Sequence, residues 1–317
     1  MARSKIFFAT DVHGSERAFL KFLGAAKFYD VKTLILAGDI TGKMIVPIVT
    51  RKDGTHRCTF LGSDVVVKSD QELADLEKNI RHNGLYPFRT NEDEVKALTE
   101  DPVKVDQLFS QLMVESVRRW MKLAQERLKP IGIRCYISPG NDDRFAIDAA
   151  LGSSDFVLNP EEKIVELDGY EMVTLGYSNI TPFDSPRELD EDKLYDKIEK
   201  LVSRVGNISN SIFNLHCPPF DTKIDKAPQL DKDLRPIVSP VGGFEMVSVG
   251  SVAVRKVIET HQPLLGLHGH VHESSGVERI GRTLCVNPGS QYTDGILRGA
   301  LVTLKDGKVE NYLLTRG

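Results

Sequence analysis

The sequence predicts an α/β fold, because buried strands alternate with amphipathic helices and the strands end in polar residues. Residues 5–10 form a compact β-prone run, and residues 33–37 form a second apolar run of strand length. Between them, residues 16–27 repeat apolar side chains at helical spacing. Strand, helix and strand at these lengths make a βαβ unit, and ligand sites of open α/β sheets lie at the carboxyl ends of such strands.

The composition is that of a soluble globular protein with one large domain or two small ones. The 317 residues are 41% hydrophobic and 27% charged, with a net charge of -4. These values exclude collagen-like, disordered and disulfide-scaffold classes, and they indicate neither nucleic acid nor anionic lipid as a partner. No apolar run approaches the ~20 residues of a membrane-spanning helix. Without a signal peptide, and with four cysteines that lack C-x-x-C spacing, the sequence predicts a cytoplasmic protein.

Residues 43–130 interrupt the α/β alternation. Two strands, 44–51 and 57–67, flank an Asp-Gly pair that predicts a hairpin, and helices follow at 71–81 and 105–128. Because no flexible linker flanks this region, we interpret residues 1–317 as a single domain and the interruption as an inserted lid or cap. The alternation then resumes, with strands at 131–138, 156–158, 163–167, 172–176, 211–215, 264–267, 283–286, 300–304 and 309–314 and helices at 190–205 and 252–260.

Polar side chains recur where the predicted strands end. They are Asp11 and His13, Asp39, Asn141, His216, and His270 with His272. In extended backbone, residues two apart point to the same side, so each of the two spaced pairs is expected to hold a single ion or a shared pair from one edge. Imidazole, carboxylate and amide without thiolate suit Mn²⁺, Fe or Zn²⁺. Seven ligands are too many for one ion with an open position, whereas they fit two ions about 3.5–4 Å apart that share a carboxylate. The excess positive charge favours a phosphate group.

In their order along the chain, these motifs resemble those of the calcineurin-like metallophosphoesterases. The matching segments are Asp11-Val12-His13, Gly38-Asp39, Gly140-Asn141-Asp142-Asp143, His216 and Gly269-His270-Val271-His272. The resemblance runs from residue 5 to about residue 290, apart from the insertion, and implies a four-layer α-β-β-α sandwich. It also implies that Asp11, His13 and His272 hold a first metal and that Asn141, His216 and His270 hold a second. Asp39 would bridge the two metals, and Asn141 would also contact phosphate.

One motif position departs from the family. The family usually has His where this chain has Asp142, and that His stabilises the transition state or protonates the leaving group. Asp142 can act as an acid only if burial and nearby charge raise its pKa, and two cations would lower it. Arg144, or His82 in the insertion, could take this role in place of Asp142.

Two further residues are candidates for contacting the substrate. His268 alternates with His270, so we weigh a substrate contact against a buried, hydrogen-bonded histidine. Asn287 begins an Asn-Pro-Gly-Ser segment that resembles a loop near the family's site, or it is part of a plain turn.

The function expected from these residues is that of a binuclear metal-dependent phosphoesterase. It would hydrolyse a phosphate monoester or diester by in-line attack of a metal-bridging hydroxide. The two divalent ions are expected to be Mn²⁺, with Fe, Zn²⁺ and Ni²⁺ as alternatives. A nuclease or cyclic-nucleotide phosphodiesterase stays open, as does a non-catalytic metal-binding scaffold of the same fold. The expected partner is a small phosphorylated substrate, with no membrane, no indicated nucleic acid, and a homo-oligomer left open.

Overall fold

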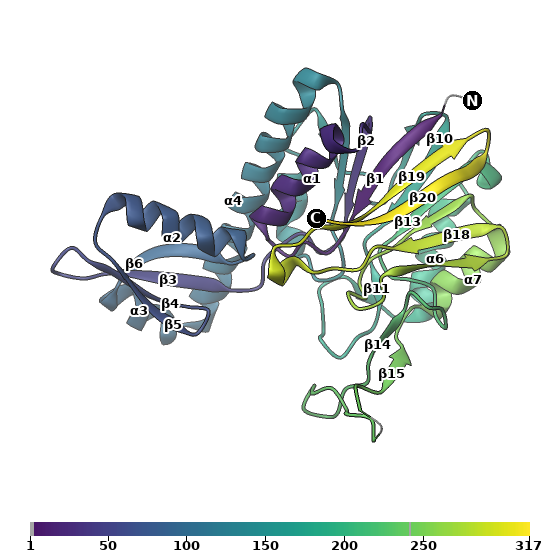
Figure 1. The fold of residues 1–317 in the computed structure, drawn as a ribbon. Helices are drawn as coiled ribbons and strands as arrows, with labels where there is room; N and C mark the ends of the chain where they lie inside the picture. The colour runs from purple at the N-terminus through teal and green to yellow at the C-terminus, as the bar shows by residue number, and fades with distance from the viewer. Residues whose placement is uncertain (1–2, 241) are drawn as a thin grey trace.

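Two six-stranded sheets share one apolar core in the computed structural model, which describes residues 3–240 and 242–317 (Figure 1). The first sheet has the order β20-β19-β1-β2-β7-β8, and the second has the order β17-β18-β16-β13-β10-β9. The strands of the first are β1 (Ser4–Ala9), β2 (Thr33–Ala37), β7 (Arg134–Ser138), β8 (Val157–Leu158), β19 (Arg298–Lys305) and β20 (Lys308–Arg316). Those of the second are β9 (Ile164–Leu167), β10 (Tyr170–Leu175), β13 (Ser211–Leu215), β16 (Leu265–Leu267), β17 (Gly276–Ile280) and β18 (Thr283–Asn287). The predicted α/β class is confirmed.

The inner faces of the two sheets pack against each other. Phe8 and Ile35 of the first sheet share a buried cluster with Met172, Leu265 and Val286 of the second. In both sheets the central strands run parallel, with β1, β2 and β7 aligned in one and β10, β13, β16 and β18 aligned in the other. Parallel strands end at the same edge, so each sheet collects the loops that follow its strands on one side.

Helices pack on the outer faces of the sheets. On the first sheet lie α1 (Glu16–Phe28), α4 (Pro102–Leu128) and the short α5 (Asp148–Leu151). Phe19 of α1 stacks on Trp120 of α4, with ring centroids 4.2 Å apart. The helices α6 (Glu191–Val202) and α7 (Val252–His261) share a core with the second sheet. Among the described residues, no helix combines the length and apolarity needed to cross a membrane.

Residues 45–99 form a smaller unit with a core of its own. Its sheet has the order β5-β4-β3-β6, and α2 covers one face. Its elements are β3 (Ile45–Thr50), β4 (His56–Phe60), β5 (Ser63–Val67), α2 (Asp70–His82), β6 (Tyr86–Asn91) and α3 (Glu92–Thr99). The buried face of α4, in contrast, belongs to the core of the first main sheet. In Figure 1 the unit stands to the left of the two large sheets.

The prediction of one strand over residues 57–67 is wrong. Leu61 and Gly62 both have positive φ, 50° and 76°, and they turn the chain between β4 and β5. The sequence analysis also missed β6, α3 and β17, as well as a thin arm whose base is β14 (Lys226–Pro228) and β15 (Met246–Ser248). The remaining short elements are β11 (Ser178–Asn179), β12 (Glu188–Leu189), and the 3-10 turns Lys129–Ile131, Phe145–Ile147, Ile208–Asn210 and Tyr292–Asp294.

The small unit contacts the main body through backbone at three glycines. A Cβ atom on Gly84 would lie 2.3 Å from the carbonyl oxygen of His13, and one on Gly42 would lie 2.0 Å from the carbonyl oxygen of Gly84. A Cβ atom on Gly14 would lie 2.7 Å from the Cα atom of Gly42. The hydroxyl of Ser15 donates to the carbonyl oxygen of His82 at 2.9 Å. The turn after α2 therefore packs directly on the loop that carries His13.

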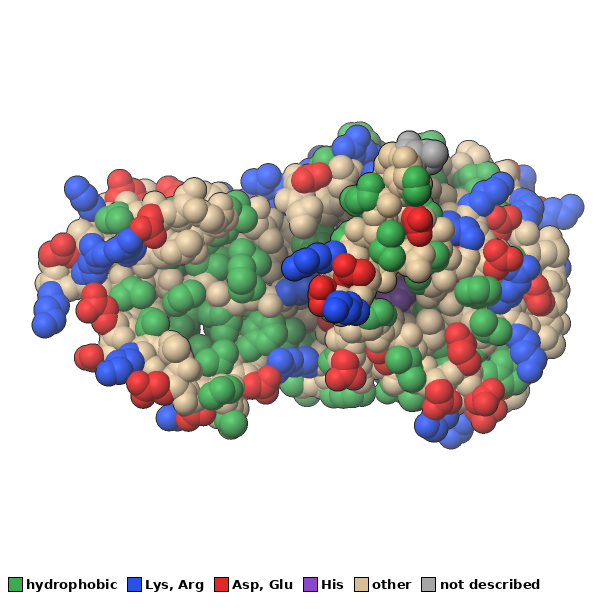
Figure 2. Space-filling view, turned by 90° about the horizontal axis from the view of Figure 1, so that it is seen from below, with side chains coloured by type: hydrophobic (Ala, Val, Ile, Leu, Met, Phe, Trp, Pro, Cys, Tyr) green, Lys and Arg blue, Asp and Glu red, His purple; other side chains and the backbone are tan. Residues whose placement is uncertain are grey.

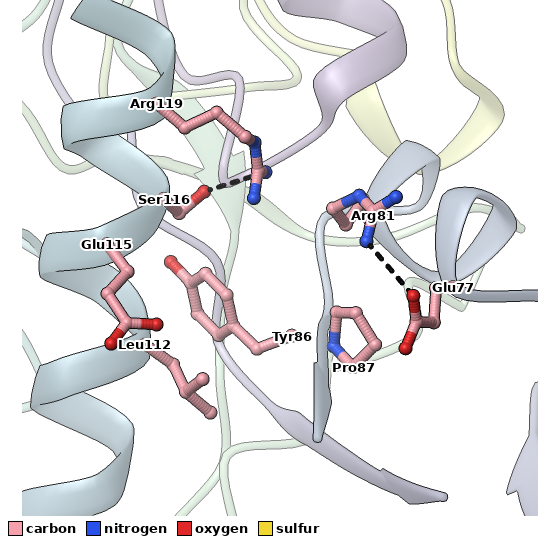
Figure 3. A pocket seen from close by; sticks show the side chains of 8 residues that line it. All are labelled: Glu77, Arg81, Tyr86, Pro87, Leu112, Glu115, Ser116 and Arg119. Carbon is pink, nitrogen blue, oxygen red and sulfur yellow. Dashed lines mark hydrogen bonds and ion pairs between the residues drawn. The ribbon is translucent and has the colours of Figure 1, made fainter. Parts of the chain in front are cut away.

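A charged junction lies beside this contact. A cavity of about 130 Å³ lies between α4 and the small unit, and Arg81, Glu77 and Arg119 are among the residues that line it (Figure 3). Arg81 and Arg119 approach the same carboxylate of Glu16, at 3.4 Å and 3.0 Å. The cavity is thus part of the joint between the two units.

The glycine contact can be tested with a matched pair of substitutions. Gly54 and Gly84 have nearly equal φ, 81° and 80°, but no atom lies within 4 Å of a Cβ placed on Gly54. Gly54→Ala should therefore lower the free energy of unfolding by about 1–2 kcal/mol, from backbone strain alone. Gly84→Ala should lower it further, by about 1–3 kcal/mol, because the new methyl group overpacks the junction.

Denaturant unfolding followed by the fluorescence of Trp120, the single tryptophan, measures this difference in the core of the main body. Equal losses in the two variants would show that the junction has room for a side chain.

Candidate metal centre

The predicted ligands follow strand ends on both main sheets. Strands β1, β2 and β7 lead into the loops of Asp11, Asp39 and Asn141. Strands β13 and β16 of the second sheet lead into the loops of His216 and His270. Because the carboxyl ends of these parallel strands meet at one edge, residues far apart in the sequence come together there.

At four of these positions the backbone is left-handed. Positive φ occurs at Asp11 (52°), His13 (39°), Asp39 (46°) and His270 (65°). The expectation that extended backbone brings each spaced pair together is therefore wrong, although Asp11 and His13 do lie close to one another. The strands end first, and left-handed residues then turn the chain. Each such turn costs an L-residue roughly 1–2 kcal/mol, and strain of this kind is typical of functional sites.

The side chains form two groups whose donor atoms lie within 4.8 Å of one another. The first group is Asp11, His13, Asp39 and His272, and the second is Asp39, His216 and His270. In the first, His272 Nε2 lies 3.5 Å from Asp11 Oδ1 and 3.0 Å from His13 Nε2. Beside the second, Asn141 Oδ1 lies 2.8 Å from His270 Nδ1. All seven predicted ligands thus meet in one place.

Asp39 belongs to both groups, and its two oxygens face different histidines. Oδ1 lies 3.4 Å from His216 Nε2, and Oδ2 lies 3.7 Å from His13 Nε2. The backbone N–H of Asp142 donates to Oδ1 at 3.0 Å and holds the carboxylate in this orientation. A carboxylate turned in this way has the geometry to bridge two cations.

Burial sets the protonation of the histidines. It lowers the pKa of His13 to about 3 and that of His270 to about 4, so both rings are neutral and can donate a lone pair. Burial also disfavours the charged ring of His216, but the carboxylate of Asp39 outweighs it and raises the pKa to about 9. A cation on Asp39 would take the place of the His216 proton.

Buried ring nitrogens without hydrogen-bond partners show that this donor set fits metal ions. Among the described residues, Nδ1 of both His13 and His216 is buried without a hydrogen-bond partner, and His216 Nε2 has only the carboxylates of Asp39 and Asp11 near it, at 3.4 Å and 3.8 Å. A buried polar atom of this kind calls for an explanation, and a bound ion is one of the few available. Carboxylate, imidazole and amide donors suit a divalent first-row metal. The two groups can therefore hold metal ions.

Three glycines leave the space that ligand side chains occupy. Each directly precedes a ligand in the sequence and lies against a ligand from another loop. The distances from a Cβ atom placed on each glycine are 1.9 Å from Gly38 to His216 Nδ1, 2.3 Å from Gly140 to Asp39 Oδ1, and 2.4 Å from Gly269 to Asp11 Oδ2. Atoms cannot approach so closely, so these motif positions exclude any larger residue.

Asp143 holds the loop of Asp39 in place. Its buried carboxylate accepts hydrogen bonds from the backbone of Gly140, Ile40 and Thr41 at 2.8–3.0 Å, and from the Thr41 hydroxyl at 2.6 Å. Burial raises the pKa of Asp143 to about 6. The buried Arg187 donates to the carbonyl oxygen of Asp143 at 2.8 Å from the other side. Sequence analysis treated Asp143 only as a motif match and missed Arg187.

Two predicted substrate residues support the loops instead. Asn287 is buried, and its Nδ2 lies 2.9 Å from the carbonyl oxygen of Val271 and 3.3 Å from that of Gly269, so it holds the His270 loop. His268 is also fully buried, and its Nδ1 lies 2.7 Å from the carbonyl oxygen of Leu215. Burial lowers the pKa of His268 to about 4. The buried, hydrogen-bonded alternative for His268 matches the structure.

Arg144 contacts helix α4. Its guanidinium binds Asp106 and Ser110 of α4, at 2.7 Å and 2.8 Å, and lies over the ring of Phe109. These contacts bind Nη1 of Arg144 to helix α4, and they give no support to the expectation that Arg144 assists catalysis.

Two residues that the sequence analysis did not single out border the site. Lys43 Nζ lies 2.8 Å from Asp142 Oδ2, and the same oxygen lies 3.7 Å from His13 Nδ1. The ring of Tyr292 lies against those of His13 and His272, with centroids 4.7 Å and 6.0 Å away. Neither Lys43 nor Tyr292 belongs to a motif, although Lys43 follows Gly38-Asp39 and Tyr292 follows the Asn-Pro-Gly-Ser segment at short distance in the sequence.

Comparisons with known proteins agree with this fold. No family model matches the chain. An uncharacterised protein of Methanocaldococcus jannaschii, MJ1162, is 35% identical over 152 residues, which are 47% of this chain and 61% of that protein. The chain thus spans less than two thirds of the curated relative it matches.

Two solved structures match nearly the whole chain at low identity. One crystal structure covers 99% of both chains at 15% identity, with a TM-score of 0.59. The other, TT1561 of Thermus thermophilus, covers 100% of this chain and 99% of its own at 14% identity, with a TM-score of 0.53. At these identities the likeness concerns the fold alone. The resemblance to the calcineurin-like metallophosphoesterases therefore stays with the motif residues, whose side chains the structure brings together in the two groups.

Proposed function

We propose that the chain is a binuclear metal-dependent phosphoesterase. The observation that carries this proposal is the position of Asp39, whose two oxygens face the two ligand groups. A first ion would be held by the group of Asp11 and a second by the group of His216, with Asn141 completing the second. Mn²⁺ is the expected metal, and Fe, Zn²⁺ and Ni²⁺ are alternatives. When bound, the ions would activate a water for in-line attack on phosphorus and neutralise the charge on the phosphoryl oxygens.

The side chains around the ligand groups would orient the substrate. Asn141 turns its oxygen toward His270, which leaves its amide N–H₂ free to donate to a phosphoryl oxygen. The loops of Asp39 and His270 are tied by Asp143 and Asn287, so the ligands are held before a substrate arrives. Preorganised donors of this kind stabilise the charge that develops in a transition state.

The proposed architecture is the four-layer α-β-β-α sandwich of the family. It rests on the shared core of the two sheets and on the helix packing against their outer faces. We also propose that residues 45–99 of the insertion 43–130 act as a lid or cap within a single domain, whereas α4 of the insertion belongs to the main core. The turn of this lid at Gly84 packs on the loop of His13, and Figure 2 shows hydrophobic side chains gathered on its lobe up to the junction with the main body. The organic part of a small phosphorylated substrate would lie on this side.

The metal content is the first test. The purified protein, reconstituted with Mn²⁺, should bind two ions per chain, and Asp39→Asn should lose at least one ion and all activity because both groups depend on that carboxylate. Asp142→Asn is the matched control, since it removes a neighbouring carboxylate that is no ligand, and it should retain both ions. Elemental analysis of the wild type that finds at most one ion per chain would refute the binuclear centre.

Leaving-group dependence tests the chemistry at Asp142. Burial, together with the negative charge of Asp39, raises the pKa of this carboxyl, while the hydrogen bond from Lys43 opposes the shift. Two bound cations would favour the ionised form, so protonation of a poor leaving group should be inefficient. The enzyme should hydrolyse nitrophenyl esters far faster than alkyl phosphates, by about 10²–10⁴-fold.

Asp142→His should then raise the rate of hydrolysis most for alkyl phosphates, because it restores a proton donor for the leaving group. Initial rates across leaving groups of graded pKa measure both effects. A shallow dependence in the wild type that becomes steep in Asp142→Asn would identify Asp142 as the working acid.

Deleting part of the insertion tests its role as a lid. The deletion should remove residues 45–99 and join the ends with a Gly/Ser linker, because α4 packs in the main core and must stay. The variant should still bind metal but hydrolyse a broader range of phosphoesters, or hydrolyse them more slowly. A panel of monoesters, diesters and nucleotides with Mn²⁺ gives the profile. If the variant binds metal and its profile equals that of the wild type, the insertion is no lid.

A further inference from the structure

Lys43 is the charged side chain that joins the insertion to the ligand groups. It stands between Gly42, whose backbone packs against Gly84, and Ile45, where β3 begins. The Lys43 side chain is 55% exposed, whereas those of His13 and Asp39 are 1% and 6% exposed. Its ammonium therefore lies at the boundary between solvent and the buried groups.

The residue Asp142 lies between the Lys43 ammonium and both ligand groups. The ammonium lies 2.8 Å from Asp142 Oδ2, and that oxygen is 3.7 Å from His13 Nδ1 of the first group. The backbone N–H of Asp142 binds the shared carboxylate of Asp39. Among the ion pairs of the described residues, no other Lys or Arg contacts Asp142 or the ligands.

Two neighbouring arginines, Arg144 and Arg187, contact other residues. Arg144 binds Asp106 and Ser110 of α4. Arg187 is buried behind the loop, where it binds Asp148 and the backbone of Asp143. Among the Lys and Arg side chains whose ion pairs the structure describes, Lys43 is therefore the one that lies beside the ligand groups.

We propose that Lys43 binds the substrate's phosphate directly, beside the ligand groups. The inference rests on the proposed phosphoesterase function and names a residue that no motif of the sequence marks. The carboxylate of Asp142 is a positioning group, which holds the ammonium toward the ligand groups. Tyr292, whose ring packs against His13 and His272, borders the same groups.

Binding of inorganic phosphate to the Mn²⁺-loaded protein tests this contact without turnover. Lys43→Met should weaken phosphate binding by about 10-fold or more, as expected for the loss of a charge-assisted hydrogen bond, with both metal ions retained. Lys43→Arg should restore most of the affinity. Lys52→Met, which removes an exposed lysine from the hairpin of the same unit, is the matched control and should bind phosphate like the wild type.

A double variant separates direct contact from simple neutralisation of Asp142. In the Asp142→Asn background, Lys43→Met should still weaken phosphate binding at least fivefold and raise the KM for a nitrophenyl ester. An unchanged affinity in that background would overturn the proposal, because Lys43 would then act only by cancelling the Asp142 charge. If the wild type hydrolyses phosphoesters and Lys43→Met has the same phosphate affinity and the same rates, this inference alone is overturned. A metal-loaded wild type that neither binds phosphate nor hydrolyses any ester would overturn the proposed function as well.

Discussion

The left-handed backbone at four ligand positions is the constraint on which the rest of the site depends. These residues lack the freedom of glycine, so the conformation persists only because surrounding bonds hold it. The loops supply those bonds to one another: the N–H of Asp11 donates to Gly38, that of His13 to Asp39, and that of Gly269 to His216, at 2.8–3.1 Å. No single loop would hold its shape alone. The ligand set is therefore a property of the assembled edge, which forms only after both sheets have packed.

The division of ligands between the sheets follows from this assembly. The first group joins residues after β1 and β2 with His272 from the second sheet, and the second joins Asp39 and Asn141 with histidines after β13 and β16. Cations in the two groups would each connect one sheet to the other at the edge of the apolar core. Stability and metal binding are then linked, since an ion that binds only the folded state raises its stability by mass action.

Local features of the sequence were sufficient to predict which side chains gather at the strand ends, but not what surrounds them. The strands before Asp11 and Asp39 are short apolar runs with polar ends, which the sequence shows directly. Strand β6 was missed because Pro87 interrupts its pattern. Arg144 was assigned to the site because it follows the Asp142 motif. Its partners on α4 are more than 30 residues away in the sequence, so no local pattern predicts them. Lys43 was missed for the same reason, since its partner Asp142 lies on the far side of the insertion. The alternation of side chains along a strand did not apply to the spaced ligand pairs, because the strands end before these residues.

The three glycines at the junction also have a use in comparing sequences. Gly14, Gly42 and Gly84 meet so closely that a single methyl group on any of them would collide with the backbone of another loop. They are separated by 27 and 41 intervening residues, so their joint presence would be improbable unless the same contact is made. A homologue that carries an insertion here but has a larger residue at the position of Gly42 or Gly84 must seat that insertion differently. The triplet can thus sort relatives by how their insertion is anchored, even where the insertions share no other residue.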